Sequence, residues 1–211
     1  MAISGGIMKT SWNTWVAVSL LFLADCNDPN AANADNFRSV LQHYYDVHPV
    51  CIALPISFPL DVAADEDEPL RLQIDALAAA GLLSQRRSSD AGVLPDIAGK
   101  THNGIRYDVA PAGEKFILGN ADSFIGGMDL CFASRRIVDI VSFSPPVEIL
   151  GMKATQVSFT YELKQIAPWA RTAVIEAAFP QIKAALEQTA GHETDGLVLT
   201  NSGWRQEREL Q

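Results

Sequence analysis

The stretch from Leu70 to Leu118 constrains the fold most, because its hydrophobic periodicity changes between clear stop signals. Pro69 precedes and Gly81 follows a stripe of apolar residues at helical spacing, namely Leu70, Ile74, Leu77 and Ala78. Proline is favoured in the first turn of a helix and glycine directly after its end. We therefore expect a helix between them.

Two apolar segments precede this helix. Asp35–Val47 has apolar residues at helical spacing and predicts a helix that Asp35 can cap. The apolar stretch Val50–Leu60 contains Pro55 and Pro59, so we expect it to be irregular and buried.

Extended segments follow this helix on both sides of a polar loop. The first runs from Leu83 to Arg87, and the second is indicated by the alternation of Ile105, Tyr107 and Val109. The loop between them, Ser88 to Gly104, is rich in turn-forming residues. The predicted order is helix, strand, loop and strand, followed by a short helix at Glu114–Leu118.

Two segments of this stretch, DALAAAGLL (Asp75–Leu83) and RYDVAPAGEKFI (Arg106–Ile117), resemble the recognition helix and wing of bacterial winged-helix regulators. The resemblance implies a winged-helix-like domain over residues 35–119. It does not imply DNA reading, because the outer face of the helix is mostly alanine and a recognition helix needs several hydrogen-bonding side chains. From Pro69 to Leu118 six basic and five acidic residues leave a charge of only +1.

The whole chain has 211 residues, a 48% hydrophobic content and a net charge of −9. This length suits one large domain or two small ones. The negative charge repels phosphate backbones, so we expect no nucleic-acid partner.

The N-terminus has the pattern of an export signal. Lys9 is the only charged residue before an apolar run from Trp15 to Ala24, which is too short to span a bilayer. We predict a signal peptide over residues 1–25, with either Met1 or Met8 as the start. A buried N-terminal helix is the alternative.

Cys26 directly follows this run. The residues Leu23-Ala24-Asp25-Cys26 resemble a bacterial lipobox, which implies that Cys26 becomes the lipidated first residue, although Asp25 departs from the small residue usual there. Ordinary cleavage after Ala34 is the competing interpretation. With the lipobox, residues 26–34 form a polar tether, and Asn27 favours the periplasmic face of the outer membrane over the inner membrane.

Two further cysteines, Cys51 and Cys131, remain if Cys26 carries lipid. In an oxidising periplasm we expect them to form a disulfide, with two buried free thiols as the alternative.

The second half of the chain has the alternation of an antiparallel sheet. In the predicted strand Ala154–Lys164, Val157, Phe159, Tyr161 and Leu163 alternate with polar residues. Pro168 and Pro180 each begin a helix, Gly191–Gly196 suggests a turn, and Leu197–Thr200 suggests a strand. We therefore predict an α+β fold, with a winged-helix-like N-terminal half followed, over residues 120–211, by an antiparallel sheet covered by helices.

Several segments of this half resemble an uncharacterised family of proteobacterial exported lipoproteins: MKATQVSFTYELK (Met152–Lys164), the Trp169-Ala170 pair, Ala178-Phe179-Pro180 and LVLTNSGW (Leu197–Trp204). The resemblance implies export, lipid anchoring and architecture, and it implies no activity.

The sequence contains no nucleophile motif, and none of the histidines His43, His48, His102 and His192 is paired at the helical spacing of a metal site. We predict no catalytic residue, no metal and no cofactor. A cleft joining a serine, a histidine and an acid would instead indicate a hydrolase.

We expect a protein-interaction or envelope-assembly module of unknown molecular activity, bound to the membrane through its lipid and to an envelope protein partner. The wing carries the predicted partner-binding residues, Arg86, Arg87, His102 and Arg106. The alternative is a small-molecule carrier with a cavity between the sheet and the Trp169–Leu186 helices. A closed core there would exclude the carrier.

Overall fold

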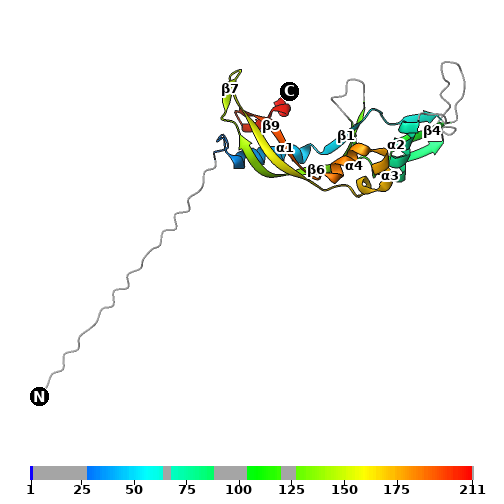
Figure 1. Cartoon of the computed structure of the whole chain (residues 1–211), viewed down its shortest axis with the longest axis horizontal. Coiled ribbons are helices and arrows are strands. Elements are labelled where there is room, and N and C mark those ends of the chain that lie inside the picture. The colour runs from blue at the N-terminus through cyan, green and yellow to red at the C-terminus, as the bar shows by residue number, and fades with distance from the viewer. Residues whose placement is uncertain (2–27, 64–67, 88–103, 120–126, 211) are drawn as a thin grey trace.

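Two β-sheets and the helices packed on them make up the computed structural model, which describes residues 1, 28–63, 68–87, 104–119 and 127–210 (Figure 1). The predicted α+β class, with a large antiparallel sheet, is confirmed. The elements in chain order are α1 (Ala34–Val47), β1 (Val50–Leu54), β2 (Leu60–Ala63), α2 (Glu68–Ala79), β3 (Leu83–Arg87), β4 (Gly104–Val109), β5 (Ile117–Gly119), β6 (Met128–Phe143), β7 (Val147–Ile149), β8 (Met152–Lys164), the 3-10 helix η2 (Pro168–Arg171), α3 (Ala173–Ala178), α4 (Pro180–Glu187), β9 (Ala190–Thr200), β10 (Gly203–Gln206) and the 3-10 helix η3 (Glu207–Leu210).

The large sheet has the strand order β1-β6-β8-β9-β10, with β5 also on β6 and β7 also on β8, and all its pairs are antiparallel. Its longest strand, β6, pairs with β1 and β5 through its first residues and with β8 from Ser134 onward. In β8, Val157 and Phe159 are fully buried while Gln156 is exposed. The alternation predicted for Ala154–Lys164 is therefore confirmed.

The small sheet has the order β2-β4-β3, and α2 connects β2 to β3. Gly81 ends this helix at a φ of 74°, which glycine adopts without steric cost, and the amide of Leu82 donates to the carbonyl of Leu77 at 2.9 Å. The predicted helix and both strands are confirmed. The predicted helix at Glu114–Leu118 is wrong, because a turn there leads directly into β5.

Two hydrophobic cores hold the described residues together. The first lies around α2, both sheets and the η2–α4 segment, with Ile74, Leu130 and Phe179 almost completely buried. The second lies between α1 and the β6-β8-β9-β10 part of the large sheet, with Phe37 and Phe159 at its centre. Each core takes residues from both sides of residue 119, where the sequence analysis divides the chain.

Each core contains residues of both predicted halves because amphipathic helices of one half pack against elements of the other half. Helix α1 belongs to the predicted N-terminal half but buries its apolar face on the sheet of the other half. Helix α3 belongs to the predicted C-terminal half but packs against α2. Periodicity shows which face of a helix is buried, not against which element.

Three local predictions need correction. Asn33, not Asp35, caps α1, because its side chain accepts from the amide of Asn36 at 2.8 Å. Part of the apolar stretch Val50–Leu60, expected to be irregular because of its prolines, forms strand β1, and Pro55 lies just beyond that strand. The predicted turn Gly191–Gly196 lies within β9.

Residues 28–33 belong to the folded body, although the sequence analysis assigns residues 26–34 to a tether. The side chain of Asn36 donates to the carbonyls of Asp28 and Ala31, each at 2.8 Å, and the indole of Trp204 donates to the carbonyl of Asn30 at 3.1 Å. These bonds fix the chain onto α1 and β10.

A disulfide joins Cys51 on β1 to Cys131 on β6, as the sequence analysis expects. The two residues are direct cross-strand partners. The bond therefore links β1, the strand that follows α1, covalently to β6, the longest strand of the large sheet.

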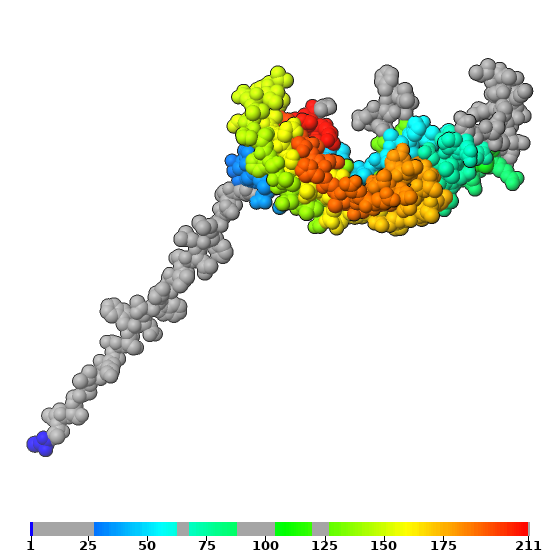
Figure 2. Space-filling view, viewed as in Figure 1, coloured from blue at the N-terminus to red at the C-terminus, as the bar shows by residue number. Residues whose placement is uncertain are grey.

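The described body is elongated (Figure 2). Helix α1, the β7–β8 hairpin and the C-terminus lie at one end, and α2 and β4 of the small sheet lie at the other (Figure 1). We call the first the α1 end and the second the small-sheet end.

Candidate functional site

Two of the predicted wing arginines, Arg86 and Arg106, lie on the same face of the small sheet. Arg106 on β4 is the cross-strand partner of both Asp61 on β2 and Arg86 on β3. Its guanidinium lies 3.1 Å from the carboxylate of Asp61, and the guanidinium of Arg86 lies 2.7 Å from the carboxylate of Asp108. We call these four residues the charge ladder.

The structure brings together two of the four predicted partner-binding residues. Arg86 and Arg106 share the ladder, while Arg87 is exposed at the end of β3, opposite Ile105. His102 and the predicted lipidation residue Cys26 lie outside the described residues. The ladder's two arginines are matched by two aspartates, so it presents alternating charge and not a basic patch.

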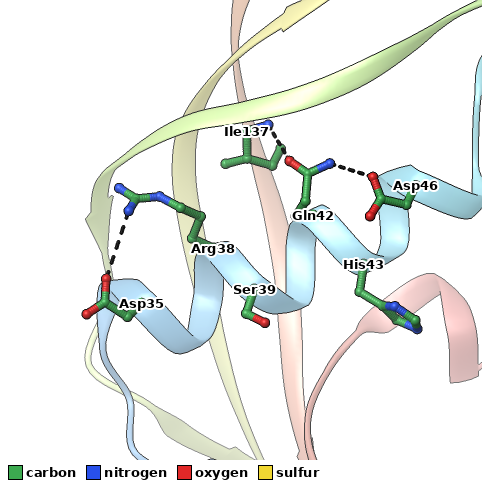
Figure 3. A pocket seen from close by; sticks show the side chains of 7 residues that line it. All are labelled: Asp35, Arg38, Ser39, Gln42, His43, Asp46 and Ile137. Atoms are coloured by element: carbon green, nitrogen blue, oxygen red, sulfur yellow. Dashed lines mark hydrogen bonds and ion pairs between the residues drawn. The ribbon is translucent and has the colours of Figure 1, made fainter. Parts of the chain in front are cut away.

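A polar hollow of about 450 Å³ lies beside α1, along β6 (Figure 3). Its wall is formed by Asp35, Arg38, Ser39, Gln42, His43, Asp46 and Ile137. The side-chain oxygen of Gln42 accepts from the amide of Ile137 at 2.8 Å, and its nitrogen donates to the carbonyl of Arg135 at 3.1 Å. Gln42 thus satisfies backbone groups of β6 as a neighbouring strand would.

This hollow holds the residue types of a hydrolase, since Ser39, His43 and Asp46 all line it. All three side chains are exposed on α1, and Asp46 accepts a hydrogen bond from Gln42 at 2.7 Å. Within the described residues, no hydrogen bond joins Ser39 to His43. A serine nucleophile needs a base within hydrogen-bond reach, and the base needs an orienting acid. The arrangement therefore lacks the contacts that would activate the serine.

A buried polar network lies under α1. The hydroxyl of Tyr45 donates to the carboxylate of Asp195 on β9 at 2.7 Å, and Arg208 lies 2.8 Å from the same carboxylate. The Asp195 side chain is only 1% exposed. Burial, reinforced by the hydrogen bond and charge of Asp195, raises the pKa of Tyr45 well above its usual value. These partners offset the cost of burying the carboxylate, so the network fixes α1 to the sheet.

Side chains fill most of the space between the large sheet and the η2–α4 segment. Ala170, Ile175, Phe179 and Ile182 from this segment are almost completely buried in the same core as Leu130 and Phe132 of β6. A hollow of about 290 Å³ remains between α4 and the large sheet, and it is polar, with Arg135, Gln188 and His192 in its wall.

More than half of the exposed large apolar side chains in the described part of the chain lie between residues 138 and 152. They extend from the second half of β6 into the β7–β8 hairpin: Val138, Val141, Phe143, Val147, Ile149, Leu150 and Met152. We call this set the apolar strip.

Sequence reasoning missed the apolar strip. The signal was VEILGMK (Val147–Lys153), in which the residues between Ile149 and Lys153 are Leu150, Gly151 and Met152. None of these three residues is polar or charged. A hairpin turn usually contains polar residues and glycine. An apolar turn was therefore the unusual feature.

Comparison with known protein families, curated proteins and solved structures finds no match for this chain. Among the described residues, no helix is long and apolar enough to cross a membrane. The same residues contain no group of three or more histidine, cysteine or acidic side chains that could hold a metal ion.

Proposed function

We propose that this chain is an exported, lipid-anchored protein on the periplasmic face of the outer membrane. In this proposal it is not an enzyme, and it presents its small-sheet end to an envelope protein partner. The observation that carries the proposal is the elongated body, in which α1 and strand β4 of the charge ladder lie at opposite ends (Figure 1).

The position of Cys26 supports the anchored orientation. Cys26 lies two residues before Asp28, whose carbonyl already accepts a hydrogen bond from Asn36 on α1. Two residues span at most about 7 Å. A lipid on Cys26 would therefore hold the α1 end close to the membrane surface and leave the small-sheet end furthest from it.

The small sheet supports a winged-helix-like scaffold. Strand β2, helix α2 and the β3–β4 pair follow one another as in a helix with its wing, and α3 packs on α2 where that domain type has another helix. The charge ladder supports protein recognition over nucleic-acid binding, because alternating charges complement a protein surface and do not complement a phosphate backbone.

The packed core beneath η2–α4 supports this proposal over the carrier. A carrier needs an apolar cavity of several hundred Å³, whereas the hollow that remains beside α4 is polar and has a volume of about 290 Å³.

Site-specific photo-crosslinking in the envelope tests the proposal. A crosslinker in place of Ser84, exposed on β3 and opposite Asp108 in the ladder, should join one envelope protein reproducibly. A crosslinker in place of Lys183, exposed on α4, is the matched control and should not join it.

The variant Arg86→Glu should weaken this crosslink, because it reverses an exposed charge of the ladder. Arg87→Glu is the matched control and should leave the crosslink unchanged, since Arg87 pairs with Ile105 and therefore lies on the other face of β3. A product that forms equally from both crosslinker positions, or that Arg86→Glu leaves unchanged, would contradict presentation of this surface.

A further inference from the structure

The β7–β8 hairpin has one apolar and one charged face. Val147 pairs with Ala154, and Ile149 pairs with Met152, so these four side chains point to one face of the hairpin. Glu148 pairs with Lys153 on the other face. Val147, Ile149 and Met152 are all about half exposed. The hairpin therefore presents apolar surface to its surroundings with no net charge.

Leu150 at the tip has an unusual conformation for its residue type. Its φ is 51° and that of Gly151 is 80°, both in the left-handed region, and its side chain is 94% exposed. Glycine and asparagine adopt this conformation readily, whereas a leucine pays a steric cost there. The tip thus combines backbone strain with an exposed apolar side chain, which is expected where that side chain contacts something outside the molecule.

The hairpin lies at the α1 end of the body, which also contains residues 28–33. Lys153 pairs with Leu199 on β9, which pairs with Trp204 on β10. Neighbouring strands lie about 4.8 Å apart, so Lys153 is about 10 Å from Trp204. Trp204 binds the carbonyl of Asn30 at 3.1 Å. Phe37 and Phe143 lie with their ring centroids 5.0 Å apart at the same end.

From this placement we propose that the β7–β8 hairpin inserts its apolar side chains, with Leu150 at the tip, into a phospholipid bilayer surface. The proposal rests on the lipid anchor proposed above. An acyl chain on Cys26 would hold Asp28 within about 7 Å of its attachment point, at the same end of the body as the hairpin. Since the hairpin carries no net charge, a zwitterionic surface is sufficient.

The contact between the hairpin and the bilayer is a second point of attachment of the protein to the membrane, beside the lipid on Cys26. A single point of attachment leaves a body free to tilt, whereas a second contact restricts its orientation. A hairpin bound to lipid would hold the long axis of the body away from the membrane, with the charge ladder directed into the periplasm.

Flotation with zwitterionic vesicles of phosphatidylethanolamine and phosphatidylcholine tests the proposal on the full mature chain. The variant Leu150→Asn places a residue that favours the left-handed tip, so it should leave the free energy of unfolding unchanged or raise it. It also removes a leucine from the bilayer surface. In the unacylated Cys26→Ser background it should lower the vesicle partition coefficient about tenfold.

The matched control is Leu72→Asn, which removes a half-exposed leucine from α2 at the small-sheet end and should leave partitioning unchanged. Equal partitioning of Leu150→Asn and the parent, or an equal loss with Leu72→Asn, would overturn the inference.

A second measurement separates this inference from the anchor. A fluorophore attached at a cysteine in place of Leu150, in the acylated protein, should be quenched by nitroxide-labelled lipid, and one in place of Val174 on α3 should not. If the protein floats with vesicles but position 150 is not quenched, the hairpin inference is wrong and the anchor stands. If the acylatable protein does not float, the anchor is wrong, and the inference falls with it.

Discussion

Tyr107 shows at the scale of a single residue how the small-sheet end is held together. Its ring is buried in the first core, and its hydroxyl donates to the carboxylate of Asp75 on α2 at 2.9 Å. Burial and this hydrogen bond raise the pKa of Tyr107 to about 12. The bond fixes α2 to β4, and therefore fixes the helix against the strand that carries Arg106.

A pH dependence follows from this shift. Tyrosine titrates near 10 in an unfolded chain, so the folded protein holds the Tyr107 proton more tightly. The resulting stability is fully present below about pH 10 and is lost as the pH rises through about 12. Tyr107→Phe should lower the free energy of unfolding by about 1 kcal/mol at neutral pH. The difference from wild type should shrink in that alkaline window.

Urea unfolding at a series of pH values measures this difference. Asp75→Asn is the control, since it keeps an oxygen acceptor but removes the carboxylate charge, and its alkaline loss should be smaller than that of wild type. A difference between wild type and Tyr107→Phe that stays constant across the alkaline range would show that the hydroxyl is not bonded as described.

At the scale of elements, the disulfide covalently links the neighbouring strands β1 and β6 of the large sheet. Cys51 and Cys131 are 80 residues apart in sequence. Closing a loop of this length lowers the entropy of the unfolded chain, which stabilises the folded state by about 4 kcal/mol at most. The double variant Cys51→Ser, Cys131→Ser should therefore unfold at markedly lower urea concentration than the oxidised protein.

Reduced wild-type protein is the control for the loss of the thiols themselves, and it should match the double variant. Equal urea midpoints for the oxidised protein and the double variant would contradict a stabilising disulfide.

Periodicity was sufficient to predict most elements and insufficient to predict their partners. Helices α1 and α2 and strands β3, β4 and β8 follow from stripes and alternation, because one face of each is buried. Leu197–Thr200 was predicted as a strand, but the first part of β9 was missed because Glu193 and Asp195 face towards Tyr45 and Asp195 is buried. Their burial depends on Tyr45 and Arg135, which belong to distant elements.

The candidate site was predicted in part for the same reason. The wing arginines stand out in the sequence, but their pairing with Asp61 and Asp108 depends on the register of three strands. The apolar strip depends on the absence of a covering element, which becomes evident only when the whole fold is assembled.

At the scale of the whole molecule, two features with opposite chemistry lie at opposite ends. The apolar strip lies at the α1 end, beside the first folded residues, and the charge ladder lies at the small-sheet end (Figure 1). A lipid on Cys26 would orient the body relative to the membrane, with the apolar end at the membrane and the charged end towards the periplasm.

Palmitate labelling combined with cell fractionation tests this account most directly, by comparing the full-length wild-type chain with Cys26→Ser. We expect wild type to incorporate the label and to fractionate with the outer membrane, and Cys26→Ser to lose the label and to be released from that fraction. Unlabelled wild-type protein that is exported in soluble form, with Cys26→Ser behaving identically, would contradict the anchored orientation.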